Sequence, residues 1–281
     1  MKFPESLENH RRAFLEALRV RNFSPATLRS RGQSLDAFFR FLSSLPPTSG
    51  GRGLDDVREV SAETIHDYQL FLSRQPWTTH TVHAKLMALR QFFRHLEKTD
   101  AVLVNPCSKM VLPRLGERLP RNVLTPAEAR RILDQPDTQT RKGIRDKAIL
   151  EVFYSTGIRL EEMSRLTTHD VDTRNGFLRV NQGKFAKDRV VPLGRKASDY
   201  VREYLQKVRS EWSKEKKDER ALWLSSIQPY APLKKQLIGV MVRQYGQAAL
   251  GLPAARQAGR SVSPHVWRHT CATHLVAGGS N

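Results

Sequence analysis

A segment near the end of the sequence combines cationic side chains with the expected start of a helix. Residues 263–269 read Ser-Pro-His-Val-Trp-Arg-His, and Pro264 is typical of the first position of a helix. His265 and Arg268 are three residues apart, so they would share one helix face near the N-terminus. This helix end carries a partial positive charge and would hold one permanent cation and one titratable donor. The pattern favours binding of a phosphate group.

A second segment places an arginine at the edge of an expected core. Residues 155–162 read Ser-Thr-Gly-Ile-Arg-Leu-Glu-Glu, in which Gly157 ends one helix and Arg159 begins the next. Met163 and its apolar neighbours have the pattern of buried residues, so Arg159 would be half-buried and would need a partner. Glu162, three residues on, is either that partner or a support that holds Arg159 facing a phosphate.

Metal-dependent chemistry has weaker support in the sequence. His265, His269 and His274 share one expected helix, and the spacing of the first two suits zinc, but no carboxylate or second cysteine stands beside them. The alternative is that His269 and His274 are satisfied inside the packed domain. Asp170 and Asp172 form only a weak magnesium pattern. Since glycine-rich nucleotide loops and common hydrolase motifs are also missing from the sequence, we expect no ATP-driven chemistry.

The net charge indicates a polyanionic partner. The 281 residues include 47 Lys and Arg against 28 Asp and Glu, which gives a formal charge of +19 and a pI near 10.4. Residues 1–115 contribute +6 and residues 116–281 contribute +13, so both halves suit nucleic acid. On charge alone, an RNA-binding protein of ribosomal type and a protein of anionic membrane surfaces remain alternatives.

Other features of the composition restrict the class of protein. No apolar run approaches the roughly 18 residues of a membrane span, and no apolar stretch follows the first residues as it does in a signal peptide. Cys107 and Cys271 are far apart, which excludes a disulfide framework and suits a reducing compartment. We expect a cytoplasmic protein with no membrane partner.

The first hundred residues have the pattern of a small helical bundle. One helix is expected over about residues 6–20, and residues with capping side chains would begin three more: Ser24, Ser61, and Thr78 or Thr79. Apolar residues repeat at helical spacing after each of these starts, most clearly over residues 79–97. Three cations lie off the apolar stripe of that last helix and are candidates for reading bases or for touching phosphates only: Lys85, Arg90 and Arg94.

The remainder of the chain is predicted to be a linker and a second, mixed domain. Residues 105–123 are basic, contain three prolines and lack periodicity, and Thr125-Pro126-Ala127-Glu128 then forms a capping box. Helices are expected over residues 126–134, 143–155, 159–167, 196–213, 234–250 and 264–277. Two β-type runs, 176–180 and 188–193, predict a hairpin with a basic tip at 182–187.

Three blocks of this sequence together resemble the tyrosine recombinase (phage-integrase-type) family, most closely its Xer-like simple members. They are Thr156-Gly157-Ile158-Arg159-Leu160-x-Glu162 with Leu166 and Asp170; Gly183-Lys184-x-x-Lys187-x-Arg189-x-Val191-Pro192-Leu193; and Pro264-His265-x-x-Arg268-His269-x-x-Ala272-Thr273-His274-Leu275. Ser24-Pro25-x-Thr27-Leu28 and the helix at 79–97 resemble the DNA-clamping domain of this family. The implied fold is mainly α, with a four-helix (SAM-like) core-binding domain over 1–104, a basic linker over 105–123, and a mostly helical catalytic domain with a small antiparallel β-sheet over 124–281.

The resemblance also implies roles for single residues. Arg159 and Arg268 would bind non-bridging oxygens of the scissile phosphate in double-stranded DNA, and His265 would donate to the phosphate or assist proton transfer. Lys184 would protonate the leaving 5′-oxygen, with Lys187 as the second candidate, and Glu162 would be structural support. The two guanidinium groups would take the role that metal ions have elsewhere, so no metal and no cofactor is implied.

The family pattern places a nucleophilic tyrosine after the second arginine, and this sequence departs from that pattern. All six tyrosines precede Arg268, none stands in a matching context, and the sequence given ends at Asn281. We therefore expect these 281 residues to lack the nucleophile segment, to bind a specific recombination site without cutting it and to be monomeric in solution, whereas the full-length recombinase would be a tetramer on DNA. A non-cleaving, sequence-specific DNA-binding protein and a type IB topoisomerase-like enzyme, which would relax supercoiled DNA without a preferred sequence, remain as alternatives.

Overall fold

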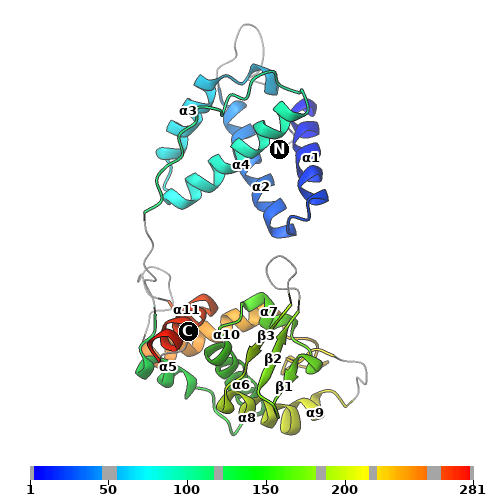
Figure 1. Ribbon diagram of the computed structural model, residues 1–281, viewed down its shortest axis with the longest axis vertical. Helices are drawn as coiled ribbons and strands as arrows, with labels where there is room; N and C mark the ends of the chain where they lie inside the picture. The colour runs from blue at the N-terminus through cyan, green and yellow to red at the C-terminus, as the bar shows by residue number, and fades with distance from the viewer. Residues whose placement is uncertain are drawn as a thin grey trace. The chain divides into compact units, whose positions relative to one another are not determined.

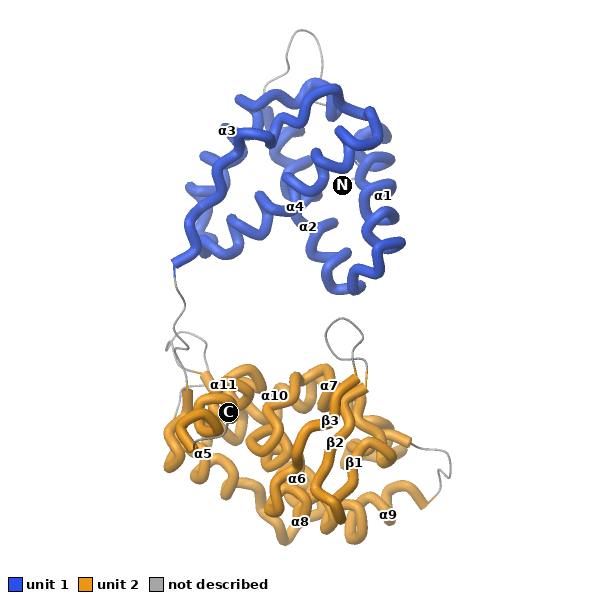
Figure 2. The backbone as a smooth tube through the Cα atoms, viewed as in Figure 1, with its two compact units in different colours: residues 1–117 blue, residues 118–281 orange. Residues whose placement is uncertain are grey.

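The computed structural model describes residues 3–45, 56–116, 123–181, 188–214, 220–251 and 261–278. They belong to two units, residues 1–117 and residues 118–281, and each unit has its own hydrophobic core (Figure 1, Figure 2). Both units are largely helical, and the second contains a three-stranded antiparallel sheet, which confirms the expected fold class. Within the described ranges, no helix is both long enough and apolar enough to cross a membrane.

Among its described residues, the first unit contains four α-helices and one short 3₁₀ turn. They are α1 (Glu5–Val20), α2 (Pro25–Leu42), η1 (Val57–Glu59), α3 (Ala62–Ser73) and α4 (Thr79–Lys98). The side chains of Ser24, Ser61 and Thr78 each accept a hydrogen bond from the backbone three residues on, so all three are N-caps, as expected. Of the two threonines that the sequence offered for α4, Thr78 is the cap.

Aromatic side chains fill the core of the first unit. Phe38 lies 4.9 Å from Tyr68 and 6.1 Å from Phe93 between ring centroids, in edge-to-face arrangements. Phe39 contacts Phe92 in the same way at 6.0 Å. These rings come from α2, α3 and α4, so the apolar faces read from the sequence meet in one core.

The first unit extends beyond its four helices. Cys107 and Met110 are buried in its core, and Arg90 donates a hydrogen bond to the Met110 carbonyl. Gln69 donates to the carbonyl of Val111 at 2.8 Å. The prediction of a linker from residue 105 is therefore wrong in its first part, because apolar residues without helical periodicity still pack against the bundle.

The second unit combines the small sheet with several helices. In chain order its elements are α5 (Pro126–Leu133), α6 (Arg141–Thr156), α7 (Leu160–Arg165), η2 (Thr168–Asp170), β1 (Val171–Asp172), β2 (Phe177–Val180), β3 (Arg189–Pro192), α8 (Arg195–Glu203), the π-helical η4 (Tyr204–Arg209), α9 (Ser210–Trp212), α10 (Lys235–Leu250) and α11 (Pro264–Ala277). The hairpin is confirmed, with Leu178 opposite Val191 and Val180 opposite Arg189. Strand β1, the π-helical segment within 196–213 and the shorter α7 differ from the expectation.

Helix α6 is the central helix of the second unit, in contact with α5, α8, α11, η4 and β3 (Figure 1). Four of its charged residues are buried: Arg145, Asp146, Lys147 and Glu151. Asp146 is fully buried, and its carboxylate accepts hydrogen bonds from Arg145 at 2.6 Å, Lys142 at 2.9 Å and Tyr245 at 3.0 Å. Because a buried charge needs such partners, this network fixes the position of α6, whose C-terminal end leads into the candidate site.

Candidate functional site

The site begins at the turn that ends α6. Gly157 has a left-handed backbone, with φ of 56°, and a Cβ atom there would lie 3.2 Å from Sγ of Cys271. This close approach brings α11 against the turn. Nη1 of Arg268, on α11, donates a hydrogen bond of 2.6 Å to the Gly157 carbonyl. Arg159, two residues after the glycine, is the N-cap of α7, so the turn brings the two expected arginines together.

Glu162 lies between the guanidinium groups of Arg159 and Arg189. Its carboxylate accepts hydrogen bonds from the backbone nitrogen of Arg159 at 2.8 Å and from the guanidinium of Arg159 at 2.9 Å. Arg189 of β3 donates to both carboxylate oxygens, at 3.0 and 2.7 Å. The Glu162 side chain is only 6% exposed. Glu162 is therefore an ion-pair partner of Arg159, and its side chain also accepts from the N-cap backbone of α7.

The charges in this arginine cluster (Arg159, Arg189, Arg268 and Glu162) affect one another. Burial opposes ionisation of Glu162, but hydrogen bonds from Arg189 and Arg159 outweigh it and lower its pKa to about 2. Burial, and then the positive charge of Arg159, lower the pKa of Arg268. Three guanidinium groups and one carboxylate give the cluster a formal charge of +2, which suits an anionic ligand.

The histidines of α11 have different surroundings. His265, in the first turn, is exposed one turn before Arg268, and His269 is exposed as well, so the alternative that His269 is satisfied inside the packed domain does not hold. Nε2 of His274 bonds the Leu124 carbonyl at 2.9 Å and Nδ1 bonds the Tyr154 hydroxyl at 3.1 Å. A carbonyl only accepts, so Nε2 donates and Nδ1 accepts from tyrosine. With both ring nitrogens occupied, His274 does not complete a zinc site with the other two histidines.

The hairpin contributes one residue that sequence reasoning missed. Lys184 and Lys187 lie outside the described residues. Arg189, which follows them at the start of β3, was recognised only as part of a motif and was given no role. Arg189 is half-buried in a strand opposite Val180, and an ordinary surface arginine could stand at such a position. What distinguishes Arg189 from a surface arginine is its contact with Glu162.

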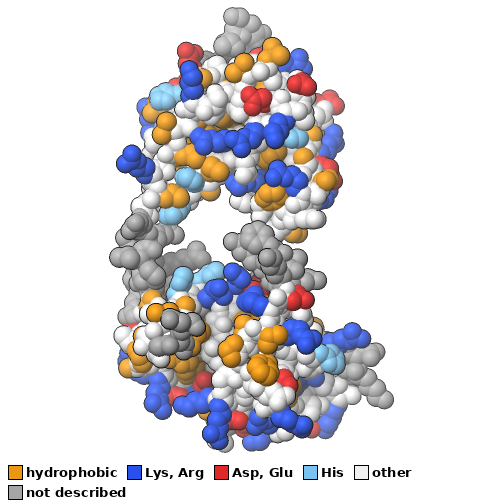
Figure 3. Space-filling model, viewed as in Figure 1, with side chains coloured by type: hydrophobic (Ala, Val, Ile, Leu, Met, Phe, Trp, Pro, Cys, Tyr) orange, Lys and Arg blue, Asp and Glu red, His pale blue; other side chains and the backbone are white. Residues whose placement is uncertain are grey.

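The candidate cations of α4 have unequal surroundings. Nζ of Lys85 lies 4.5 Å from the ring centroid of Trp77, and burial, followed by the charge of Arg40, lowers its pKa. The guanidinium of Arg90 donates to the Met110 carbonyl, so Arg90 makes a structural contact within the first unit. Arg94 is exposed. Figure 3 shows Lys and Arg side chains gathered in a row on one face of this unit.

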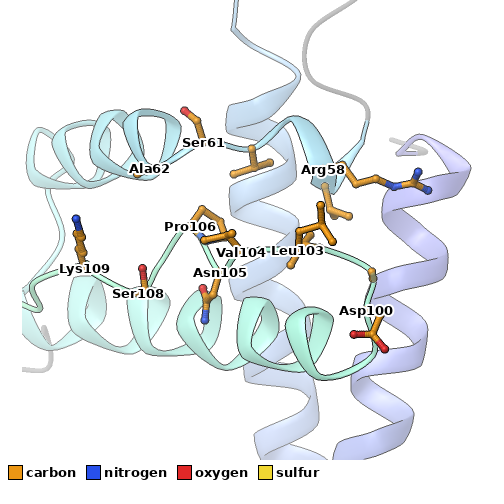
Figure 4. A pocket seen from close by; sticks show the side chains of 14 residues that line it. Arg58, Ser61, Ala62, Asp100, Leu103, Val104, Asn105, Pro106, Ser108 and Lys109 are labelled. Carbon is orange, nitrogen blue, oxygen red and sulfur yellow. The ribbon is translucent and has the colours of Figure 1, made fainter.

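A cavity of about 880 Å³ also lies in the first unit. It is lined by the turn at η1 and by the segment after α4, including Ser61, Val104 and Asn105 (Figure 4). Leu103 at its edge is 98% exposed. None of the arginines of the cluster lines it, because these belong to the second unit. Its size alone therefore does not make it a reaction site.

Residues 122–281 match the model of the phage integrase family. The chain belongs to this family. Tyrosine recombinase XerC 2 of Ralstonia nicotianae is 32% identical over 98% of this chain and 76% of its own length. Tyrosine recombinase XerD of Vibrio cholerae serotype O1 is 32% identical over 79% of this chain and 70% of its own length. The expected resemblance to Xer-like tyrosine recombinases is thereby confirmed.

Solved structures show the same fold. A lambda integrase dimer bound to a COC′ core site matches 97% of this chain and 71% of its own with a TM-score of 0.70 at 16% identity. XerH recombinase bound to its difH substrate matches 93% of this chain and 71% of its own with a TM-score of 0.67 at 17% identity. At these identities the similarity establishes the fold of this phage integrase family member.

All six tyrosines of this family member lie in the described residues. Tyr68 and Tyr204 are fully buried, and burial raises the pKa of Tyr204 to about 12. Burial likewise raises the pKa of Tyr154, which bonds His274, and of Tyr245, which donates to Asp146. The two remaining rings contact other side chains: Tyr200 lies under Lys147, and Tyr230 stacks on Trp212.

Proposed function

We propose that this protein is a site-specific DNA recombinase whose arginine cluster binds the scissile phosphate of double-stranded DNA. The observation that carries the proposal is the meeting of Arg159 and Arg268 at the Gly157 turn, with Glu162 between Arg159 and Arg189. Two guanidinium groups at one point match the two non-bridging oxygens of a phosphodiester. Membership of the phage integrase family supports the same function.

The reaction chemistry follows from this charge. Attack on a phosphodiester concentrates negative charge on the non-bridging oxygens of a pentavalent transition state, and fixed cations stabilise that charge more than the ground state. In this proposal Arg159 and Arg268 supply the stabilisation, and the exposed His265 adds a donor at the N-terminus of α11. Lys184 protonates the leaving 5′-oxygen, with Lys187 as the second candidate.

Binding of the duplex involves both units in this proposal. The first unit, residues 1–117, acts as the core-binding domain and the second unit, residues 118–281, as the catalytic domain, each carrying a positive net charge. Lys85 and the exposed Arg94 are the cations of α4 that contact DNA, and Arg90 acts through Met110 instead. In this proposal the chain is a monomer in solution, and the recombinase acts as a tetramer on its recombination site.

We further propose that none of the six tyrosines present is the nucleophile, so that this chain binds DNA without cutting it. Cleavage needs a phenol in line with the leaving oxygen, at near-attack distance. The buried or hydrogen-bonded state of Tyr68, Tyr154, Tyr204 and Tyr245 opposes that role. Tyr200 and Tyr230, packed on other side chains, also lack the sequence context of the family nucleophile.

The phosphate site is tested by binding of a short fluorescent duplex at several salt concentrations. We expect Arg159→Ala and Arg268→Ala each to weaken binding about tenfold and to reduce the slope of log Kd against log salt by about one. Arg165→Ala is the matched control, because Arg165 is an exposed arginine of α7 paired with Glu161. Equal effects of all three substitutions would contradict the assigned site.

The absence of cleavage is tested separately. The chain is incubated with nicked duplex DNA and run on a denaturing gel. We expect no covalent protein–DNA band, because four of the tyrosines are buried or hydrogen-bonded and the other two lack the sequence context of the family nucleophile. A band would show that one of the six tyrosines is the nucleophile, and single Tyr→Phe variants would then identify it.

A further inference from the structure

We infer that Arg189 is a positioning residue for Arg159: by holding the carboxylate of Glu162, it keeps the Arg159 guanidinium available to the phosphate. The inference rests on the proposed function. It assigns a specific task to a strand residue whose two terminal guanidinium nitrogens both donate to Glu162.

The hydrogen-bond count of Glu162 supports this role. A carboxylate offers about four acceptor positions. Arg189 fills two of them with its two terminal nitrogens, and Arg159 fills the other two with its backbone nitrogen and one guanidinium nitrogen. The remaining nitrogens of the Arg159 guanidinium are therefore not required by Glu162, and the side chain is 37% exposed.

Removal of Arg189 would unbalance this arrangement. Glu162 would remain nearly buried with half of its acceptor positions empty, which is costly for a charged group. Arg159 is the neighbouring donor that already contacts it, so its guanidinium would turn further towards the carboxylate and away from the phosphate. Arg189 thus frees Arg159 by satisfying Glu162.

The arrangement also distinguishes Arg189 from a phosphate ligand. Both terminal nitrogens of its guanidinium point at Glu162 in a bidentate pair, at 2.7 and 3.0 Å. Hydrogen bonding to Glu162 raises the pKa of Arg189, so the two partners strengthen each other's charged state. Arg189 therefore acts through Glu162, and its effect on DNA binding depends on the presence of Arg159.

A double-mutant cycle on the 281-residue chain tests this dependence, with a short fluorescent duplex as the probe. We expect Arg189→Gln to weaken binding about tenfold, as Arg159→Ala does, and the double variant to bind no more weakly than Arg159→Ala alone. Arg179→Gln is the matched control, because Arg179 is an exposed arginine on the neighbouring strand. Its effect should multiply with that of Arg159→Ala.

A rescue experiment separates positioning from a general loss of structure. Glu162→Gln placed in the Arg189→Gln protein removes the unsatisfied charge, so we expect it to recover at least part of the lost affinity. Arg189→Lys keeps the charge but cannot bridge both oxygens, and its affinity should lie between those of the wild type and Arg189→Gln. Circular dichroism establishes that each variant is folded; if Arg189→Gln is not, the same cycle is run with Arg189→Lys.

Each outcome has a definite meaning. Multiplicative effects of Arg189→Gln and Arg159→Ala would overturn the inference, because Arg189 would then contact DNA independently. No recovery by Glu162→Gln would overturn it as well. An unchanged affinity in Arg159→Ala would overturn the proposed phosphate site itself, and this inference with it, so the two failures are distinguishable.

Discussion

At the scale of single residues, Glu162 balances the charges of the candidate site. It is nearly buried and accepts four hydrogen bonds from Arg159 and Arg189. With a neutral residue at this position, the guanidinium groups of Arg159 and Arg189 would lose the carboxylate that they share. They would then bond to solvent instead, and their positive charges would repel each other. The carboxylate therefore preorganises the cations before any ligand arrives, which is the property that electrostatic catalysis needs.

This balance predicts a pH-dependent contribution to stability. The folded-state pKa of Glu162 is lowered from 4.5 to about 2, so its contribution is fully present above pH 4.5 and is lost as the pH falls towards 2. We expect Glu162→Gln to lower the free energy of unfolding by about 2 kcal/mol at neutral pH. The difference from the wild type should shrink below pH 4.5, as measured by urea unfolding across this range.

The control for this measurement is Glu203→Gln, which removes a carboxylate paired with Lys207 on the surface of α8. A surface pair of this kind contributes under about 1 kcal/mol. A difference between Glu162→Gln and the wild type that stays constant from neutral pH down to pH 2 would show that the charge of Glu162 is not what stabilises the cluster.

Residue identities in the site were predictable only in part. Arg159 and Arg268 were identified because their motifs have fixed local spacing, and the structure brings them together. Arg189 was given no role, because its contact with Glu162 joins a strand to a helix 27 residues away. The surroundings of His269 and His274 were left open between two alternatives, since helical spacing does not reveal which helix faces pack against another element.

At the scale of elements, the site depends on the contact between the end of α6 and helix α11. Gly157 makes this contact possible because it has a left-handed backbone and no side chain. Cys271 occupies the space that a Cβ atom would need. The carbonyl of the same glycine accepts a hydrogen bond from Arg268. The packing of α11 against the end of α6 therefore also sets the position of the Arg268 guanidinium.

Gly157→Ala tests this arrangement. A left-handed backbone costs an L-residue about 1–2 kcal/mol, and the contact with Cys271 at 3.2 Å adds to that cost. We expect a loss of about 2–3 kcal/mol in unfolding experiments and weaker DNA binding, because α11 must shift. Cys271→Ala in the same protein should restore part of both.

Gly251→Ala is a closely matched control. Gly251 ends α10 with φ of 60°, but a Cβ atom there would meet nothing within 4 Å. It should show the conformational cost alone and leave DNA binding unchanged. If both substitutions have the same effect, the contact of Gly157 with Cys271 does not position Arg268.

Elements with strong local signals were predicted well. Capping residues such as Ser24 and Thr125 marked helix starts that the structure confirms, and the β2–β3 hairpin lies where alternation and turn residues placed it. Strand β1 was not predicted, because two residues carry no periodicity. The π-helical segment of Tyr204–Arg209 differs from an α-helix in hydrogen bonding but hardly in residue pattern.

At the scale of the whole molecule, each unit has a core of its own, and the first core includes residues beyond α4. Cys107 and Met110 are buried there, and Asn105 is buried with its side chain accepting from the backbone of Cys107. The sequence boundary at residue 104 followed from composition, which marks prolines and charges but not tertiary packing. The core therefore places the end of this unit later.

This difference predicts the stability of two fragments. Residues 1–116 retain the buried Cys107 and Met110, and the Met110 carbonyl accepts from Arg90, whereas residues 1–104 lose these contacts. Burial of one large apolar side chain contributes about 1.5–3 kcal/mol, so we expect 1–104 to be less stable than 1–116 by about 3 kcal/mol or to be unfolded. Thermal unfolding by circular dichroism measures this, and equal stability would show that residues 105–116 do not belong to the first core.

The charge of the whole molecule leads to the last prediction, which concerns how many phosphates the two units contact. Both units are basic, with +6 on residues 1–115 and +13 on residues 116–281, so in the proposed function both bind the same duplex. Each phosphate contact adds about 0.9 to the slope of log Kd against log salt. We expect a slope of about 6 for the 281-residue chain and about half of it for residues 1–116, both measured by fluorescence anisotropy on one short duplex. Equal slopes would mean that the arginine cluster and the rest of the second unit do not contact the DNA that the first unit binds, and a slope near zero would remove the electrostatic basis of the proposed function.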